Sequence, residues 1–448
     1  MKPATDAPNS TSEDKIRAIV LRPVQAGVSR DQNARLEEAK GLAAALDLNV
    51  VQSEVVTLRE ISPRTLFGSG RVERLKDDVE AQDAGVVVVD SVLSPVQQRN
   101  LERDINAKVI DRTGLILEIF GRRARTREGR LQVELARQAY ERSRLVRTWT
   151  HLERQRGGLG KTGGPGETQI ELDRRQIADR ILKLKRELEE VRRTRGLARR
   201  ARARAGLPAV VLVGYTNAGK STLFNRLTQA GVLAKDMVFA TLDPTARLVK
   251  LPSGRGVVMS DTVGFISDLP TELVAAFRAT LEAVMEADLL IHVRDIASAE
   301  SDEQRTDVLA VIAQLAKEEA QKTPPLIEAW NKIDLLPIAT REARLRRAGA
   351  LEPTALAPVA ISAETGEGIE ALLAAIDRAA FSATRIVTIP LDPADGKTRA
   401  RIASVGRILE EHLDEDHTLL VTAELSVEDA ARFAPAEPLP AELRPAAE

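Results

Sequence analysis

A short glycine-containing loop carries the clearest chemistry in this 448-residue chain. It follows the apolar run 209–213 and precedes a helix-forming stretch at 222–227. Its glycines let backbone N–H groups turn inward, and the N-terminus of the next helix adds partial positive charge, so it predicts a phosphate-binding P-loop. Lys220 would reach the β and γ phosphates of a nucleoside triphosphate, and the Ser221 hydroxyl would bind Mg²⁺. The expected loop residues are Gly214, Tyr215, Thr216, Asn217, Ala218, Gly219, Lys220 and Ser221.

Two segments further along the chain, each after an apolar strand candidate, indicate which triphosphate this is. Asp261 follows the stretch 257–259, where its carboxylate would hold Mg²⁺ and the nearby Gly264 N–H could meet the γ phosphate. Asp334 follows the stretch 326–330, and its carboxylate only accepts hydrogen bonds. Guanine offers two donors in the matching arrangement and adenine does not, so Asp334 selects GTP over ATP.

Neighbouring residues complete the predicted guanine site. Asn331 would tie its loop to the P-loop, and the stem of Lys332 would cover the base. A third strand candidate at 359–361 precedes a loop that would present a backbone N–H to guanine O6. The residues of this loop are Ser362, Ala363 and Glu364.

The candidates for the hydrolysis step are Lys220, Thr241, Gly264 and Asn217. Thr241 would bind Mg²⁺ beside Ser221 and Asp261 and sense the γ phosphate, although Thr245 fits the spacing as well. Phe265 stands where Ras-like GTPases carry a glutamine that orients water, and a phenyl ring cannot do that, so we expect slow hydrolysis without assistance. Asn217 either holds a K⁺ ion beside the phosphates or only stabilises the loop.

The composition is that of an ordinary globular protein with an uneven charge distribution. The net charge is −1, yet residues 121–206 hold 25 Lys and Arg against 11 Asp and Glu. That basic region predicts a surface facing a polyanion. The chain has no cysteine, and we find neither a secretory signal at its start nor an apolar run of the roughly 18 residues that span a bilayer. We therefore expect a cytoplasmic protein without an integral membrane segment, which leaves room for peripheral membrane association.

Changes in pattern divide the sequence into an α/β chain of several domains. We expect a disordered tail at 1–14, an N-terminal α/β domain with a mainly parallel sheet at 15–125, and a basic helical hairpin at 126–206. A P-loop domain with a mainly parallel sheet follows at 207–380. A small α+β domain with a proline-rich tail ends the chain at 381–448, with strands expected at 386–390 and 418–422 and a helix at 403–413.

The turn of the predicted hairpin is rich in glycine. Residues 156–166 hold six glycines together with Arg156 and Lys161. Gly158, Gly160 and Gly163 match the spacing of a dinucleotide-binding loop, but a charged helix precedes them where that loop needs a strand. We interpret the segment as a mobile basic loop that lets backbone approach phosphate closely.

Several segments resemble the HflX family of translational GTPases across residues 15–380. They include Pro63 to Gly70 in the first domain, Thr126 to Leu135 at the start of the hairpin, and Gly163 to Gln169 with Asp173-Arg174-Arg175 at its turn. The resemblance implies an N-terminal α/β domain, a hairpin with a glycine-rich loop, and a central GTP-binding domain. It also assigns Thr222 to the phosphate and Mg²⁺ site.

The resemblance further implies GTP hydrolysis coupled to binding of the large ribosomal subunit and its RNA, and splitting of stalled ribosomes under stress. The alternative is a GTP-controlled RNA-binding factor in ribosome assembly or RNA remodelling. We expect a monomer that binds GTP and GDP and does not bind DNA.

Overall fold

The computed structural model describes most of the chain. The described residues are 15–25, 31–124, 126–153, 165–204, 207–228, 245–266, 283–318, 320–350, 357–381, 384–414 and 417–433. They fall into two compact units. The first includes the chain up to Leu188, and the second holds most of the remainder.

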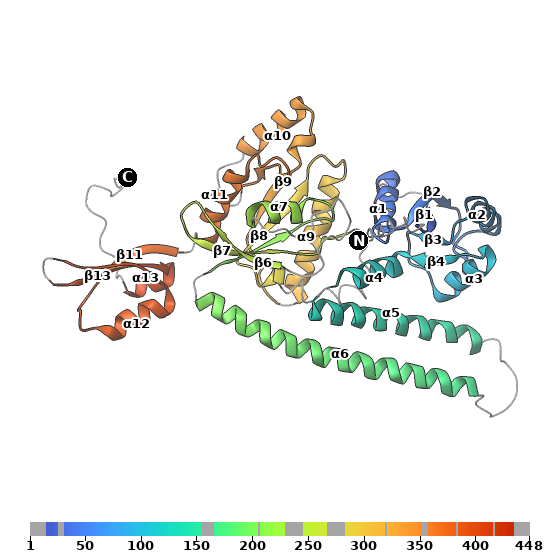
Figure 1. The fold of residues 1–448 in the computed structure, drawn as a ribbon, viewed down its shortest axis with the longest axis horizontal. Coiled ribbons are helices and arrows are strands. Elements are labelled where there is room, and N and C mark those ends of the chain that lie inside the picture. The colour runs from blue at the N-terminus through green and yellow to red at the C-terminus, as the bar shows by residue number, and fades with distance from the viewer. Residues whose placement is uncertain are drawn as a thin grey trace, which may run out of the picture. The chain divides into compact units, whose positions relative to one another are not determined.

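The first unit begins with a four-stranded parallel sheet of order β2-β1-β3-β4. Strands β1 and β3 are central, and residues 18–21 of β1 and all of β3 are buried, because helices connect each strand to the next (Figure 1). Asp31 caps α1, and Ser94 and Gln97 form a capping box at α3. The elements are β1 (Arg17–Gln25), α1 (Gln32–Ala44), β2 (Asn49–Leu58), α2 (Ser69–Gln82), β3 (Val86–Val89), α3 (Pro95–Ile105), β4 (Lys108–Asp111) and α4 (Arg112–Arg123).

A buried ion-pair network lies at the carboxyl end of β3. Asp90, which is 1 % exposed, accepts hydrogen bonds from Arg22 at 2.9 Å and from Arg112 at 2.5 Å. Arg112 also reaches Glu38 at 2.8 Å. Burial alone would lower the pKa of Arg112, but the charges of Asp90 and Glu38 outweigh it and raise that pKa. Each buried charge in the network therefore has a partner of opposite sign.

A second network joins the carboxyl end of β4 to the first helix of the hairpin. Asp111 caps the N-terminus of α4, where its side chain accepts a hydrogen bond from the Gly114 amide at 2.8 Å. It also accepts a hydrogen bond from the Tyr140 hydroxyl at 2.8 Å. Arg144 lies 3.5 Å from the same carboxylate. Burial, and then the charge of Asp111, raise the pKa of Tyr140. The hairpin is thus attached to the sheet by a neutral hydroxyl that donates to a buried carboxylate.

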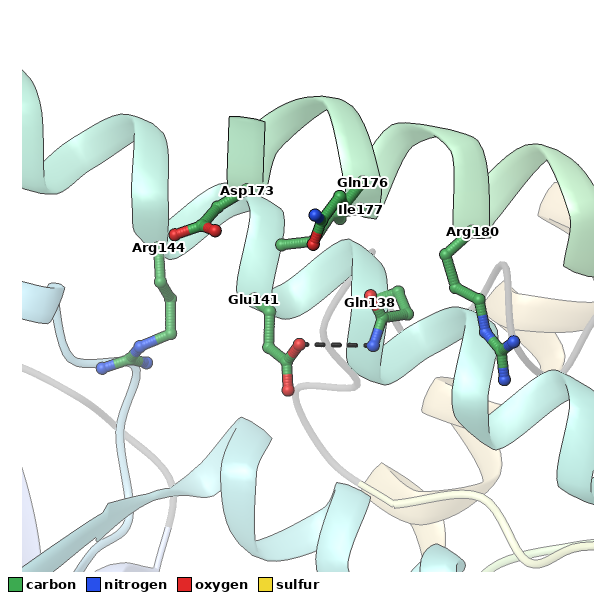
Figure 2. Close-up of a pocket in the computed structure, with 7 residues that line it drawn as sticks. All are labelled: Gln138, Glu141, Arg144, Asp173, Gln176, Ile177 and Arg180. Carbon is green, nitrogen blue, oxygen red and sulfur yellow. Dashed lines mark hydrogen bonds between the residues drawn. The ribbon is translucent and has the colours of Figure 1, made fainter. Parts of the chain in front are cut away.

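The predicted hairpin consists of α5 (Arg127–Glu153) and α6 (Pro165–Arg204), which lie side by side (Figure 1). They are antiparallel, since Arg180 of α6 lies 3.9 Å from Glu134 of α5 while Asp173 lies nearer Arg144 along the same groove. That groove has a volume of about 700 Å³. Figure 2 shows its lining residues: Gln138, Glu141, Arg144, Asp173, Gln176, Ile177 and Arg180. Residues 154–164, most of the predicted glycine-rich loop, lie outside the described residues.

The second unit contains a six-stranded sheet of order β10-β9-β8-β5-β7-β6. All neighbours are parallel except β6 and β7. Central strand β5 is an apolar run buried on both faces, as parallel strands between helices require. Central strand β8 is buried as well, although it contains His292 and Arg294. The elements are β5 (Ala209–Val213), α7 (Lys220–Thr228), β6 (Thr245–Lys250), β7 (Gly256–Asp261), β8 (Leu289–Asp295), α9 (Ser301–Glu318), β9 (Leu326–Asn331), the 3-10 turn η1 (Ile333–Leu335), α10 (Ile338–Ala350), β10 (Val359–Ala360) and α11 (Ile369–Ala380).

A small C-terminal domain completes this unit with an antiparallel sheet of order β11-β13-β12. Its elements are β11 (Thr384–Leu391), α12 (Gly396–Val405), β12 (Arg407–Leu413), β13 (Leu419–Ser426) and α13 (Val427–Phe433). The helix expected at 403–413 is wrong, because α12 ends at Val405 and the rest is strand. Gly406 permits this change, since a Cβ there would stand 2.2 Å from Leu425 Cδ2.

Arg255 links the C-terminal domain to the P-loop domain. Arg255, in the turn between β6 and β7, reaches Asp377 of α11 at 2.8 Å and Glu424 of β13 at 2.7 Å. Its guanidinium also lies 3.9 Å from the centre of the Phe381 ring. The predicted fold class of a multi-domain α/β protein with a hairpin and a small α+β domain is confirmed. No helix among the described residues is long and apolar enough to cross a bilayer.

Candidate GTP-binding and hydrolysis site

The P-loop turns between β5 and α7 in a backbone conformation that only glycine tolerates. Gly214 has a φ of 148° and a Cβ there would meet the Val293 carbonyl oxygen at 2.3 Å. Gly219 has a φ of 93° and a Cβ there would meet Asn331 Nδ2 at 2.2 Å. Both glycines therefore allow close approach by neighbouring strands, and the loop they bracket opens at the carboxyl edge of the sheet.

Lys220 is buried at the start of α7 and its side chain bends back over the loop. The ammonium donates to the carbonyl oxygens of Gly214 at 3.1 Å and Tyr215 at 2.7 Å. Burial lowers the pKa of Lys220 to about 8, while the charge of Asp261 acts in the opposite direction. Bound phosphates would add negative charge beside this ammonium and raise its pKa again.

Ser221 and Asp261 bring together oxygen ligands of the kind that Mg²⁺ prefers. The Ser221 hydroxyl donates to the Asp261 carboxylate at 2.7 Å, and Asp261 is fully buried at the end of β7. Mg²⁺ commonly takes one or two protein oxygens and fills its other positions with water and substrate phosphate. No group of three or more His, Cys, Asp or Glu residues suited to a metal occurs among the described residues. This hydroxyl and carboxylate therefore fit Mg²⁺ bound with a nucleotide, whose phosphate oxygens the ion would polarise.

The segment after β7 runs directly along the P-loop. Phe265 donates its N–H to the Gly214 carbonyl at 3.0 Å, and its carbonyl accepts from the Thr216 amide at 2.7 Å. Gly264 fits between these contacts because a Cβ there would stand 2.8 Å from Thr216 Cα and 3.0 Å from Lys220 Nζ. The Phe265 ring is buried and carries no group that could orient water.

The loops expected to bind guanine meet at Asn331. Its amide nitrogen donates to the Ala218 carbonyl at 2.8 Å, and its amide oxygen accepts from the Ala363 N–H at 2.9 Å. One buried side chain thus links the P-loop, the end of β9 and the loop after β10. Lys332 forms an ion pair with Asp295 at 2.8 Å, which holds its stem at the end of β8. Asp334 is exposed in η1, where a base could approach its carboxylate.

The geometry does not assign a role to three of the predicted residues, Thr241, Thr245 and Asn217. Thr241 lies outside the described residues, and Thr245 begins β6 opposite Asp261. Asn217 is exposed on the P-loop with a φ of 59°, a left-handed conformation that asparagine tolerates. That backbone conformation accounts for an asparagine without any ion, so both interpretations of Asn217 stay open.

The fold and the arrangement of these residues define the class of protein. The phosphate loop, the strand-end aspartate, the Asn331 link and an exposed Asp334 lie at the carboxyl edge of one mostly parallel sheet, and together they make this a P-loop GTPase domain.

Comparisons with known proteins identify the family. Residues 33–121 match the N-terminal domain of GTP-binding GTPases, residues 123–202 their middle region, and residues 209–332 the domain described as 50S ribosome-binding GTPase. GTPase HflX of Magnetococcus marinus is 50% identical over 408 residues, which cover 90% of this chain and 91% of that protein. GTPase HflX of Escherichia coli is 42% identical over 403 residues, which cover 90% and 92%. The chain belongs to the HflX family of GTPases, and it is a GTP-hydrolysing enzyme.

Sequence reasoning missed two residues that shape the site. Asp295, the partner of Lys332, ends β8 and could have been found as a further carboxylate at a strand end. Arg226 on α7 donates to the carbonyls of Ala363, at 2.6 Å, and Glu364. It has no comparable signal, because an arginine in the last turn of a helix most often faces solvent.

Proposed function

We propose that this GTPase binds the large ribosomal subunit in its GTP-bound form and splits stalled ribosomes under stress, with hydrolysis allowing release. The observation that carries the proposal is the hairpin in the same chain as the GTP site. At about 1.5 Å per residue, the 27 residues of α5 and the 40 of α6 extend roughly 40 and 60 Å. An element of that length can reach deep into a large particle.

The surface of α6 suits a polyanionic partner. Between residues 171 and 191, only Ile181, Leu184 and Leu188 are buried. The exposed acids of this stretch are Glu171, Asp179, Glu189 and Glu190, and its exposed cations are Arg174, Arg175, Arg180, Lys183, Lys185 and Arg186. Over the whole of α6, 13 Lys and Arg stand against 7 Asp and Glu, which gives the helix its net positive charge. Ribosomal RNA would contact these cations through its phosphates. Such binding weakens steeply as the salt concentration rises, because the release of counterions from the RNA then contributes less free energy.

The guanine site is part of the same proposal. Asp334 would accept from the guanine donors, the loop 362–364 would donate to O6, and the P-loop residues through Thr222 would bind the phosphates. Ser221, Asp261 and Thr241 would hold Mg²⁺. Because Phe265 cannot orient water, the ribosome would supply what accelerates hydrolysis.

Sedimentation of ribosomes tests the splitting step. Intact 70S particles incubated with the protein and a non-hydrolysable GTP analogue should separate into subunits, with the protein on the 50S fraction. Reversal of Arg174, Arg175 and Lys185 to glutamate should abolish splitting, because three phosphate contacts are lost. Binding restricted to precursor 50S particles, without loss of 70S, would instead support a role in ribosome assembly.

A matched control separates the hairpin from overall charge. Arg385, Lys397 and Arg407 are equally exposed cations on the C-terminal domain. Their reversal to glutamate changes the net charge by the same amount and should leave splitting intact. Loss of splitting in both triple variants would remove the hairpin from the proposal.

Asn217 carries a narrower proposal, that K⁺ beside the phosphates accelerates hydrolysis. Turnover measured in K⁺ should then exceed turnover in Na⁺ at equal ionic strength, and Asn217→Ala should remove the difference. Equal rates in the two salts would leave Asn217 with a role in loop conformation alone.

A further inference from the structure

The loop after β10 is held from two sides at a single residue. The N–H of Ala363 donates to Asn331 Oδ1 at 2.9 Å, and its carbonyl accepts from Arg226 Nε at 2.6 Å. The next carbonyl, that of Glu364, accepts from Nη2 of the same guanidinium. Arg226 therefore uses the two arms of its planar fork on two successive peptide groups.

Arg226 connects this loop to the phosphate-binding end of the site. It stands six residues after Lys220 on α7, the helix that begins at the P-loop. Asn331 ties the loop to Ala218, two residues before α7 begins, and Arg226 ties it to the last turn of α7. Two independent links thus fix the distance between the guanine-facing loop and the phosphate-facing loop.

The loop is also shaped to admit the guanidinium. Gly366 has a φ of 94°, and a Cβ there would stand 2.8 Å from Arg226 Nη1. Among the described residues, no carboxylate forms an ion pair with Arg226. The simplest competing explanation is that Arg226 only interacts, as a cation in the last turn, with the carbonyls at the C-terminus of α7. That explanation accounts for neither the two carbonyls of another loop nor the space left by Gly366.

The amides of Ser362, Ala363, Thr365 and Gly366 donate within the protein, which leaves the Glu364 amide for a ligand. We propose that Arg226 is a positioning residue for guanine recognition, which holds the loop 362–366 so that the Glu364 amide faces guanine O6. The inference rests on the proposed guanine site. It predicts that Arg226 matters for the 6-oxo group and not for the phosphates, the ribose or the 2-amino group.

A comparison of two nucleotides that differ at the base tests this role. The probes are GDP and 2-aminopurine riboside 5′-diphosphate, which keeps the 2-amino group and lacks both the 6-oxo group and the N1–H. Arg226→Met should raise the Kd for GDP roughly tenfold, the effect of losing hydrogen bonds from a charged donor. The Kd for the 2-aminopurine nucleotide should change less than about twofold, because that ligand makes no contact with the loop amides. Turnover at saturating GTP should also stay within about twofold, so the loss appears in KM and not in kcat.

Two further variants complete the experiment. Arg226→Lys keeps one donor and should give an intermediate Kd for GDP. Arg378→Met removes an exposed arginine from the last turn of α11, the same place on a helix, and should change neither Kd. Equal losses for the two nucleotides in Arg226→Met, or no loss for either, would overturn the inference.

The proposed guanine site can fail separately. Asp334→Asn should weaken GDP, whose N1–H and 2-amino groups would both donate to the carboxylate, and should weaken the 2-aminopurine nucleotide much less, because that base has no N1–H. If the unmodified protein bound the two nucleotides equally well, the guanine site itself would be refuted and the inference with it. If the unmodified protein discriminates but Arg226→Met discriminates equally, only the role of Arg226 is overturned.

Discussion

The parallel sheet of the N-terminal domain and the mostly parallel sheet of the P-loop domain both have buried aspartates at strand ends, but these aspartates have different neighbours. In the N-terminal domain Asp90 is bound by two arginines and Asp111 by a tyrosine hydroxyl and a backbone amide. In the P-loop domain Asp261 meets a serine hydroxyl and lies near the Lys220 ammonium. The two arginines make Asp90 structural, and the cap on α4 together with the Tyr140 hydroxyl does the same for Asp111. A hydroxyl that can turn towards a metal instead leaves Asp261 able to take part in chemistry.

The largest effect should come from removing the partner of the buried arginines. Asp90→Ala leaves the charge of Arg112 without its closest partner, which should cost about 3–5 kcal/mol in the free energy of unfolding. Differential scanning calorimetry of the full chain would show the N-terminal transition moving to lower temperature. Glu118→Ala, which breaks the exposed pair with Arg137, should cost less than about 1 kcal/mol. Equal shifts in the two variants would mean that the Asp90 network is not structural.

The same substitution in the other sheet should affect chemistry and leave stability largely intact. Asp261→Ala removes the carboxylate that would orient Mg²⁺, and we expect phosphate release to fall about 10²–10³-fold. The N-terminal transition should not move, and Asp90→Ala should keep normal turnover per folded molecule at low temperature. If Asp90→Ala lost turnover as severely as Asp261→Ala, the distinction between the two sheets would fail.

Arg255 offers an intermediate case, because its carboxylate partners are buried but its own side chain is partly exposed. Arg255→Met should cost about 1–2 kcal/mol in the stability of the C-terminal domain, seen as faster proteolysis of that domain. Arg255→Lys keeps the charge but cannot bridge Asp377 and Glu424, so its rate of proteolysis should lie between those of the unmodified protein and Arg255→Met.

Hydrogen bonds from Ser253 and Arg255 outweigh burial and lower the pKa of Asp377. This contribution is present above about pH 4 and should be lost as pH falls further. Unchanged proteolysis in both variants would show that Arg255 does not secure the domain.

The smallest effect concerns the proton on Lys220. Because burial lowers its pKa to about 8 and phosphates should raise it, GDP binding at pH 9 should take up nearly one proton. At pH 7 the uptake should be near zero. Titration calorimetry in buffers of different ionisation enthalpy measures this number. Lys220→Arg stays charged at both pH values and should show no uptake, and uptake in that variant would assign the proton to another group.

The sequence predicted the parts of the site that follow from local spacing. Gly214, Gly219, Asp261 and Asn331 stand at strand ends in recognisable motifs, and parallel strands bring their carboxyl ends to one edge of the sheet. Arg226 and Arg255 could not be found in this way, since their partners are 122 to 169 residues distant in sequence and are set by tertiary packing.

The error at 403–413 has a specific cause. Val405, Leu409 and Leu413 recur at helical spacing, yet all three are exposed. The pairing of β12 with β13 overrode that local pattern, and pairing between distant strands is not visible in the spacing of one segment.

The most direct test of the central claim is GTP turnover with and without purified 50S particles. If binding of the ribosome by the hairpin accelerates a site that hydrolyses GTP slowly in the free protein, 50S particles should raise turnover at least tenfold. Reversal of Arg174, Arg175 and Lys185 should remove the stimulation and leave the unstimulated rate unchanged. Equal turnover with and without 50S particles, or full stimulation of the reversed variant, would contradict the coupling between hairpin and GTP site.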